Sequence, residues 1–190
     1  MIRESIITTL SAAGEPHIVP MGVIWRDETP ILAPFHPSRT LGNLREQPYA
    51  VINHTDDVRV FAGGVTGRRD WPVRPAQVAR GVVLEGALSH QEIEVSSVEE
   101  DPARPRFRCR IVHEAAHAAF RGFNRAQAAV IEGAILISRL ELLPLEKIER
   151  EMAYLAIAVE KTAGPVEQEA WDWLQARLDA FRRETGGKRP

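Results

Sequence analysis

The sequence predicts a mainly β protein with helices at its C-terminal end, in which the β part forms an antiparallel barrel. Up to about residue 111, short apolar runs alternate with turn-forming residues, which is typical of short strands joined by tight turns. Farther along, apolar residues recur at spacings of three and four, the period of amphipathic helices. We therefore expect a barrel domain over residues 1–122 and a helical region over residues 123–190, packed on the barrel or on a second copy of the chain.

The expected strands are bounded by recognisable turns, Gly14-Glu15-Pro16 and Asp27-Glu28-Thr29-Pro30 among them. Strands are expected at 5–10, 17–25, 31–35, 49–53, 82–88, 91–98 and 106–112. The stretch 62–80 is rich in Gly, Arg and Pro and has no hydrophobic period, so it is expected to be a loop.

The helical region begins with residues 124–137, which are apolar almost all round and are therefore expected to be buried. Two amphipathic helices follow, one on each side of Gly164-Pro165. The apolar residues of these two helices are Leu145, Ile148, Met152, Leu155 and Val159, then Trp171, Leu174, Leu178 and Phe181. Stripes with this spacing are typical of a core or a subunit interface.

Composition excludes several classes of protein. A net charge of -2 and a pI near 6.3 give no basic field for nucleic acid, so no nucleic-acid partner is expected. The single cysteine, Cys109, excludes an intrachain disulfide and a cysteine-rich metal site. The first residues lack the layout of a signal peptide and no apolar run reaches membrane-spanning length, so no membrane association is expected and the expected compartment is the cytoplasm.

The stretch Ser38-Arg39-Thr40-Leu41-Gly42-Asn43-Leu44 is the strongest candidate for a binding site. His36-Pro37 ends the preceding apolar run, and Ser38 is a favourable N-cap for a short helix. Hydroxyl, guanidinium and amide groups at a helix N-terminus can hold a phosphate monoester from several sides. The alternative is that Ser38 only caps a connecting helix and that Arg39 is solvated.

These residues also carry a resemblance to a known family. Thr40 and Asn43-Leu44, followed by Val51-Ile52-Asn53, resemble a pattern of flavin-reductase-like FMN split-barrel proteins. More closely, the chain resembles an archaeal-type family of unknown function whose members adopt that barrel and bind FMN. The matching stretches lie at 4–9, 20–23, 34–35, 38–44, 51–57, 123–126 and 130–132.

The resemblance implies an FMN-binding split β-barrel with a C-terminal helical extension, assembled as a homodimer with the flavin site at the subunit interface. It implies that Ser38, Arg39, Thr40 and Asn43 contact the phosphate, that Met21, Gly22, Asn53 and Thr55 lie near the flavin ring, and that Asn124 and Arg125 complete the pocket. Some of these residues have a purely structural alternative: Met21 could fill the core, and Thr55 and Asn124 could cap helices. Arg125 opens an apolar helix that is expected to be buried, so it should need an anionic partner, a phosphate or Asp56 or Asp57.

The implied function is that of an FMN-binding flavoprotein, an oxidoreductase or flavin reductase of unknown substrate. The flavin would carry the redox chemistry, which agrees with the absence of an evident acid–base pair in the sequence. The alternative is a non-catalytic module that binds flavin or another small ligand.

One further motif, His113-Glu114-Ala115-Ala116-His117, matches the H-E-x-x-H pattern of zinc metalloproteases. A zinc hydrolase needs this segment on a helix and a third ligand, for which Glu132 is the evident acidic candidate. We expect instead the start of a surface or interface helix, and no metal ligands.

Overall fold

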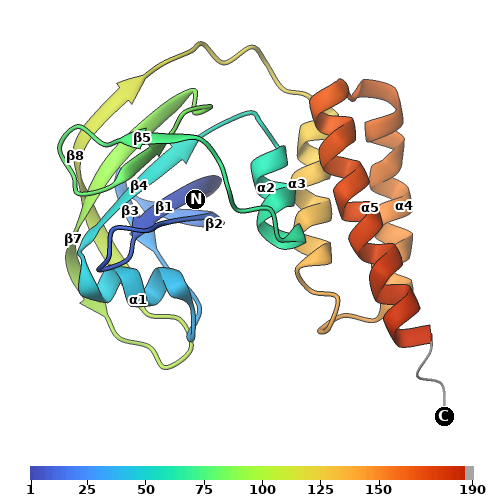
Figure 1. Cartoon of the computed structure of the whole chain (residues 1–190), viewed down its shortest axis with the longest axis horizontal. Coiled ribbons are helices and arrows are strands. Elements are labelled where there is room, and N and C mark those ends of the chain that lie inside the picture. Colours follow the sequence, from blue (N-terminus) through green and yellow to red (C-terminus); the bar gives the residue numbers. More distant parts are fainter. Residues whose placement is uncertain (187–190) are drawn as a thin grey trace. The chain divides into compact units, whose positions relative to one another are not determined.

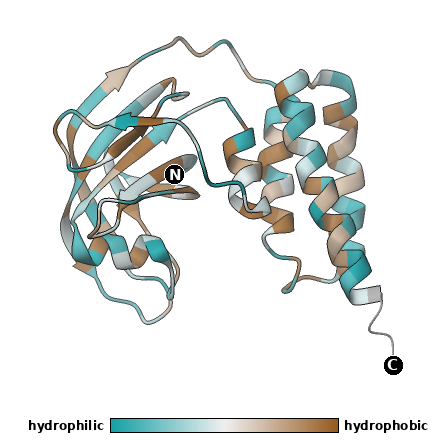
Figure 2. Cartoon of the chain, in the orientation of Figure 1, coloured by the Kyte–Doolittle hydropathy of each residue, from teal (hydrophilic) through white to brown (hydrophobic). Residues whose placement is uncertain are grey.

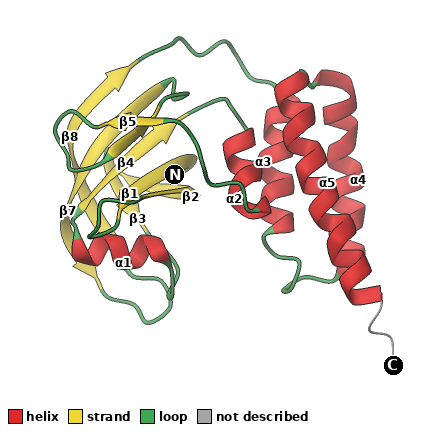
Figure 3. Ribbon diagram, in the orientation of Figure 1, coloured by secondary structure: helices red, strands yellow, loops and turns green. Residues whose placement is uncertain are grey.

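The computed structural model describes residues 1–186, and it divides into two compact units (Figures 1 and 3). The first unit comprises residues 1–56 and 69–120, and the second comprises residues 57–68 and those from 121 onward. Residues 57–68 lie within the range expected for the barrel domain but group with the C-terminal helices. The last four residues of the expected helical region lie outside the described residues.

The first unit is a closed antiparallel barrel, as the sequence predicts. Its strands follow the order β1-β2-β3-β8-β7-β4 around the barrel. Their bounds are β1 (Ile2–Leu10), β2 (Pro16–Arg26), β3 (Thr29–Leu32), β4 (Tyr49–His54), β7 (Ser89–Glu99) and β8 (Arg106–Ala116). Because the strands form a closed ring, each one has a hydrogen-bonded neighbour on both sides and none presents a bare edge.

The barrel interior is filled by alternate residues of the strands, among them Ile7, Ile52 and Phe107, each at most 1% exposed. In Figure 2, apolar and polar residues alternate along these strands. Helix α1 (Arg39–Glu46) closes one end of the barrel by packing Leu41 and Leu44 against the same core. The free thiol of Cys109 lies in this core, where burial raises its pKa to about 12.

A small two-stranded sheet, β5 (Val73–Pro75) and β6 (Val82–Leu84), lies outside the barrel ring. The buried carboxylate of Glu92, on β7, holds the turn between the two strands. It accepts hydrogen bonds from the backbone N–H groups of Gln77, Val78 and Ala79, with donor–acceptor distances of 2.6, 2.7 and 2.6 Å. Burial opposes ionisation of Glu92, but these three donors together with His90 outweigh it and hold the pKa of the carboxyl below its usual value.

Two further buried side chains of the barrel bind strand β6. The Thr8 hydroxyl donates to the carbonyl oxygen of Val82. The Asn53 side chain accepts from the N–H of Leu84 at 2.8 Å and donates to the carbonyl oxygen of Ile6 at 3.1 Å. Polar side chains on the outer face of the barrel therefore pair with the main chain that covers them.

The expected loop over 62–80 is wrong in part, because helix α2 (Arg59–Thr66) and strand β5 fall within or overlap it. Helix α2 forms despite its paired glycines because Val60, Phe61 and Ala62 bury their side chains. Strand β5 forms because it pairs with β6, a long-range contact that no local pattern records.

The second unit packs α2 with α3 (Arg125–Ile137), α4 (Leu145–Thr162) and α5 (Pro165–Gly186). Its core includes the apolar stripes expected from the sequence, with Ile148, Met152 and Leu174 at most 1% exposed. The close packing of α3 depends on Gly133, where a Cβ would stand 3.0 Å from the Trp171 ring. Within the described residues, no helix combines the length and the apolar character that crossing a membrane requires.

We predict that Asn53→Ala lowers the stability of the flavin-free protein, because the N–H of Leu84 loses its buried acceptor. The expected loss is about 1–3 kcal/mol, the usual cost of an unsatisfied buried polar group. Urea denaturation followed by Trp fluorescence measures it. Ser96→Ala, which removes an exposed hydroxyl bonded to a backbone carbonyl, is the control and should cost about 0.5 kcal/mol or less. Equal stability of the two variants would contradict the assigned role of Asn53.

Candidate functional site

The N-terminus of α1 is built as the sequence predicts. Ser38 has extended backbone angles and its hydroxyl accepts a hydrogen bond from the N–H of Leu41 at 3.3 Å, so it is the N-cap. The first turn of a helix leaves backbone N–H groups without intrahelical partners, and its dipole favours an anion. The cap and the anion site are therefore compatible uses of the same turn.

Arg39 extends beside this turn. Its guanidinium contacts the Glu15 carboxylate at 3.0 Å, and the two side chains are 47% and 70% exposed. An ion pair this exposed contributes about 0–1 kcal/mol. Arg39 can therefore exchange Glu15 for a stronger anionic partner at little cost.

Two more basic side chains, His17 and Arg69, lie near Arg39, although nothing in the sequence connects them. His17 is the second residue of β2, and its pKa is lowered first by burial and then by the positive charges of Arg39 and Arg69. Arg69 lies at the start of the segment that carries β5 and β6. The three side chains form a cationic cluster at the α1 end of the barrel.

Thr40 and Asn43 face the protein instead of solvent, with exposed fractions of 3% and 5%. The Asn43 amide donates to the Thr9 hydroxyl of β1 at 2.9 Å. In this structure both residues hold α1 against the barrel, and their contact with a phosphate stays a prediction.

The residues expected near the flavin ring are spread over different faces. Met21 packs against the barrel core, in line with the core-filler alternative. Gly22 faces the opposite side of β2, where a Cβ would stand 2.8 Å from Ile2 Cγ2. The Asn53 side chain is buried and bonded within the barrel, and Thr55 donates to the carbonyl oxygen of Gly86 at 3.0 Å. The capping alternative for Thr55 is wrong, since α2 begins after Val58.

Asn124 and Arg125 belong to the second unit. Asn124 is the N-cap of α3, accepting from the N–H of Ala126 at 2.7 Å, which agrees with the capping alternative. Arg125 is exposed, so the expectation of a buried arginine in need of an anion is wrong. The reason is that the first turn of α3 buries Ala126 and turns Arg125 outward. Asp57 pairs with Arg59 at 2.7 Å instead.

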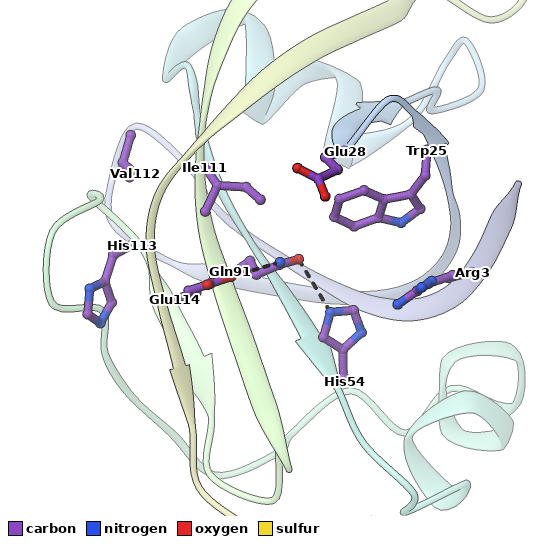
Figure 4. Close-up of a pocket in the computed structure, with 9 residues that line it drawn as sticks. All are labelled: Arg3, Trp25, Glu28, His54, Gln91, Ile111, Val112, His113 and Glu114. Atoms are coloured by element: carbon purple, nitrogen blue, oxygen red, sulfur yellow. Dashed lines mark hydrogen bonds between the residues drawn. The ribbon is translucent and has the colours of Figure 1, made fainter.

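A cavity of about 600 Å³ opens at the end of the barrel remote from α1. Its lining consists of Arg3, Trp25, Glu28, His54, Gln91, Ile111, Val112, His113 and Glu114. Figure 4 shows Trp25, Ile111 and the hydrogen-bonded His54 and Gln91 converging, whereas His113 points to the other side of β8. Arg3 and Thr9 mark the two ends along β1, so this cavity lies about 20 Å from the helix α1 site.

On the outer face of the barrel, β7 and β8 bring together His90, Glu92, His113 and His117. His90 is 2% exposed, its Nε2 lies 3.3 Å from Glu92 Oε1, and its Nδ1 lies 2.8 Å from His117 Nε2. Burial, then the charges of neighbouring groups, lower the pKa of His90, although Glu92 acts in the opposite direction.

The expected helix start at His113-Glu114-x-x-His117 is wrong, because residues up to Ala116 belong to strand β8. The segment pairs with β7 in register, and this pairing outweighs the helical propensity of its alanines. The zinc-protease motif also fails on geometry, since it needs two histidines one helical turn apart. On a strand, neighbouring residues face opposite sides, so Glu114 lies on the other face from His113. His117 follows the end of the strand and reaches His90 with its Nε2.

The sequence did not predict two groups of residues that the structure brings together. His17 and Arg69 are separated by a long stretch of chain and join the cationic cluster only through tertiary structure. His90 and Glu92 form an H-x-E pair, and their spacing of two residues is typical of one face of a strand. Together with the histidines at 113 and 117, this pair could have indicated a cluster of histidine and carboxylate side chains.

Comparison with known families gives two matches that together cover most of the chain. Residues 3–118 match the N-terminal domain of a family described as protein of unknown function (DUF447), and residues 124–176 match its C-terminal part. No curated protein sequence matches the chain.

Among solved structures, this chain is similar to an FMN-bound DUF447 protein from Methanosarcina mazei. The TM-score is 0.82 with 18% identity, and the match covers 93% of this chain and 94% of that one. A 2-nitrobenzoate 2-nitroreductase from Pseudomonas fluorescens matches with a TM-score of 0.52, 18% identity and coverage of 60% and 64%. Flavoredoxin from Methanosarcina acetivorans matches at 0.51, with 13% identity and coverage of 61% and 69%. At these identities the similarity establishes the split-barrel fold.

We predict that the pKa of His17 lies below its ordinary value of about 6.5 and rises in Arg69→Ala, because a nearby positive charge disfavours protonation. Adding inorganic phosphate should also raise it, since an anion in the cluster stabilises the imidazolium. Histidine NMR titration measures both effects. Arg26→Ala, which removes an exposed arginine at the far end of β2, is the control. A His17 pKa that is the same in both variants would show that the three groups do not form one site.

Proposed function

The chain belongs to the DUF447 family, and because a protein of that family has an FMN-bound crystal structure, we propose that this protein binds FMN and uses it as an oxidoreductase. The observation that carries the proposal is the similarity to that structure over nearly the whole of both chains. The nitroreductase and flavoredoxin matches support a redox use of the barrel. We propose the cytoplasm as the compartment.

The FMN phosphate is proposed to bind at the N-terminus of α1. The first turn offers backbone N–H groups, the Ser38 hydroxyl lies at its start, and Arg39 is held only by an exposed ion pair. Arg69 adds positive charge at the same place, and the His17 imidazole lies near both arginines. A phosphate dianion would thus replace Glu15 as the partner of Arg39. Thr40 and Asn43 would act by fixing the helix that presents these groups.

The flavin ring is proposed to lie along β2 from this phosphate site. His17 lies near the start of the strand, and Met21 and Gly22 follow four and five positions later, about 13–17 Å along it. Gly22 exposes main chain without a side chain, which allows close approach of a flat ring once Ile2 and Glu4 move aside. Asn53 and Thr55 are proposed to contribute to the flavin site indirectly, because their hydrogen bonds fix the main chain at the end of β4.

We propose a homodimer with the flavin site at the subunit interface. Large apolar side chains that a solitary chain leaves exposed support this, with Phe35 66% exposed in the first unit and Tyr154 75% exposed in the second. Asn124 and the exposed Arg125 are proposed to complete the pocket within this assembly. In that case Arg125 acquires its anionic partner only on assembly.

Bound FMN would supply the electron-transfer chemistry. The chain's own part is to bind and orient the cofactor. The cavity at the far end of the barrel is lined by both cationic and anionic side chains, Arg3 and Glu28 among them, so it does not select a substrate charge.

We predict that the protein binds FMN in preference to riboflavin and that Arg39→Ala weakens FMN binding by about tenfold or more. Each charge-assisted hydrogen bond to the phosphate contributes roughly 1.5–3 kcal/mol, and about 1.4 kcal/mol corresponds to a factor of ten. Fluorescence titration with both flavins measures this. Arg45→Ala, on the last turn of the same helix and paired with Glu100, is the matched control. Equal losses for FMN and riboflavin in Arg39→Ala would show that Arg39 does not contact the phosphate.

The alternative function is a non-catalytic module in which flavin is stored or has a structural role. We predict that a nicotinamide donor bleaches the absorption of the bound flavin and that an added acceptor restores it. Stopped-flow absorbance measures both steps, with free FMN as the control for uncatalysed reduction. Reduction no faster than that of free FMN, with each of NADH and NADPH, would favour the binding module.

A further inference from the structure

The cluster on the outer face of the barrel takes no part in the proposed flavin site. His113 on β8 stands directly opposite Glu92 on β7, and His90 lies two residues before Glu92 on the same face. One ligand atom from each of His90, Glu92 and His113 lies within 4.8 Å of the other two. The neighbouring strands β7 and β8 thus bring together three side chains of the types that bind metal ions.

The hydrogen bonds of Glu92 leave one direction open among these ligands. Its Oε2 accepts from Val78 and Ala79, and its Oε1 accepts from Gln77. A carboxylate oxygen has two lone pairs, so the one that remains on Oε1 is directed to His90 Nε2 at 3.3 Å. That separation equals, to within about 0.1 Å, the spacing of two ligands around a tetrahedral zinc ion with bonds of about 2.0–2.1 Å.

His113 provides the second observation. Its Nε2 is buried and has no hydrogen-bond partner among the described residues. Buried polar atoms without a partner are rare because each one costs free energy. An ion between His90 and Glu92 would give this nitrogen a partner after a small rotation of the ring.

His117 completes the arrangement from outside. Its Nε2 lies 2.8 Å from His90 Nδ1 and 2.9 Å from Arg74 Nη2, so its one lone pair is an acceptor shared by both groups. A His90 ring that donates its Nδ1–H to this acceptor has its Nε2 lone pair free for a cation. Metal-bound histidines commonly donate their second ring N–H to such an acceptor. Arg74 Nη2 lies 2.9 Å from His117 Nε2, so the charge that opposes a cation is next to His117 and not among the three ligands.

We propose that His90 Nε2, Glu92 Oε1 and His113 Nε2 bind one divalent transition-metal ion of the Zn²⁺ type. Two imidazoles and one carboxylate suit Zn²⁺ and leave a fourth position for water. The ion ties β8 to β7 and, through Glu92, to the turn at residues 77–79. It is a different site from the H-E-x-x-H protease motif, because Glu114 faces away and binds Gln91 at 3.2 Å.

The test is Zn²⁺ binding by the whole chain after treatment with a chelator, measured by equilibrium dialysis with metal analysis and by the thermal midpoint. We expect one zinc per chain and a rise in the midpoint with zinc concentration. His113→Phe, which keeps a ring but removes the nitrogen, should melt like the parent without metal and should bind zinc at least about tenfold more weakly. This variant avoids Glu92, whose removal would disturb folding.

His36→Ala removes an exposed histidine outside the cluster and should bind zinc like the parent. A parent that retains no zinc after dialysis, or a His113→Phe variant that binds it as tightly as the parent, would overturn the proposal. Flavin content measured on the same samples should be equal in parent and His113→Phe. That readout keeps this proposal separate from the flavin site, since either can fail without the other.

Discussion

The buried negative charge of Glu92 is the constraint on which the outer face of the barrel depends. A carboxylate with no exposure to solvent must find donors inside the protein, and it finds them in three successive backbone N–H groups and in His90. These contacts fix the turn between β5 and β6 against β7. Asn53 and Thr8 hold the returning strand in the same way. The covering segment is therefore anchored by polar pairs in addition to its buried apolar residues, Val83 and Leu84 among them.

The same anchoring connects the two sites of the first unit. The segment fixed by Glu92 begins with Arg69, which contributes charge to the cluster around His17, and it ends at β7, which carries His90. Beside His17, helix α1 is positioned by Leu41 and Leu44 in the core and by Asn43 on Thr9. The buried residues of α1 fix the position of the helix, and its exposed residue Arg39 remains available to a ligand.

The fold and part of the site were accessible from the sequence. Ser38 as an N-cap and the run of short strands were predicted correctly, because caps and strands are recorded in neighbouring residues. The helix expected after residue 113 and the loop expected over 62–80 were wrong for a common reason. Both segments take their structure from distant partners: β8 from β7, β5 from β6, and α2 from α3 and α5.

The sequence by itself determined the barrel followed by helices, the capped turn with Arg39, and the family to which the chain belongs. Only the tertiary structure decided which polar residues serve the fold and which remain free: it buried Asn53 and Asn43, and it exposed Arg125. It also joined His17 to Arg69, and His90 and Glu92 to His113. The physical reason is that burial and charge proximity depend on strand register and chain closure, which are set by contacts between residues far apart in the chain.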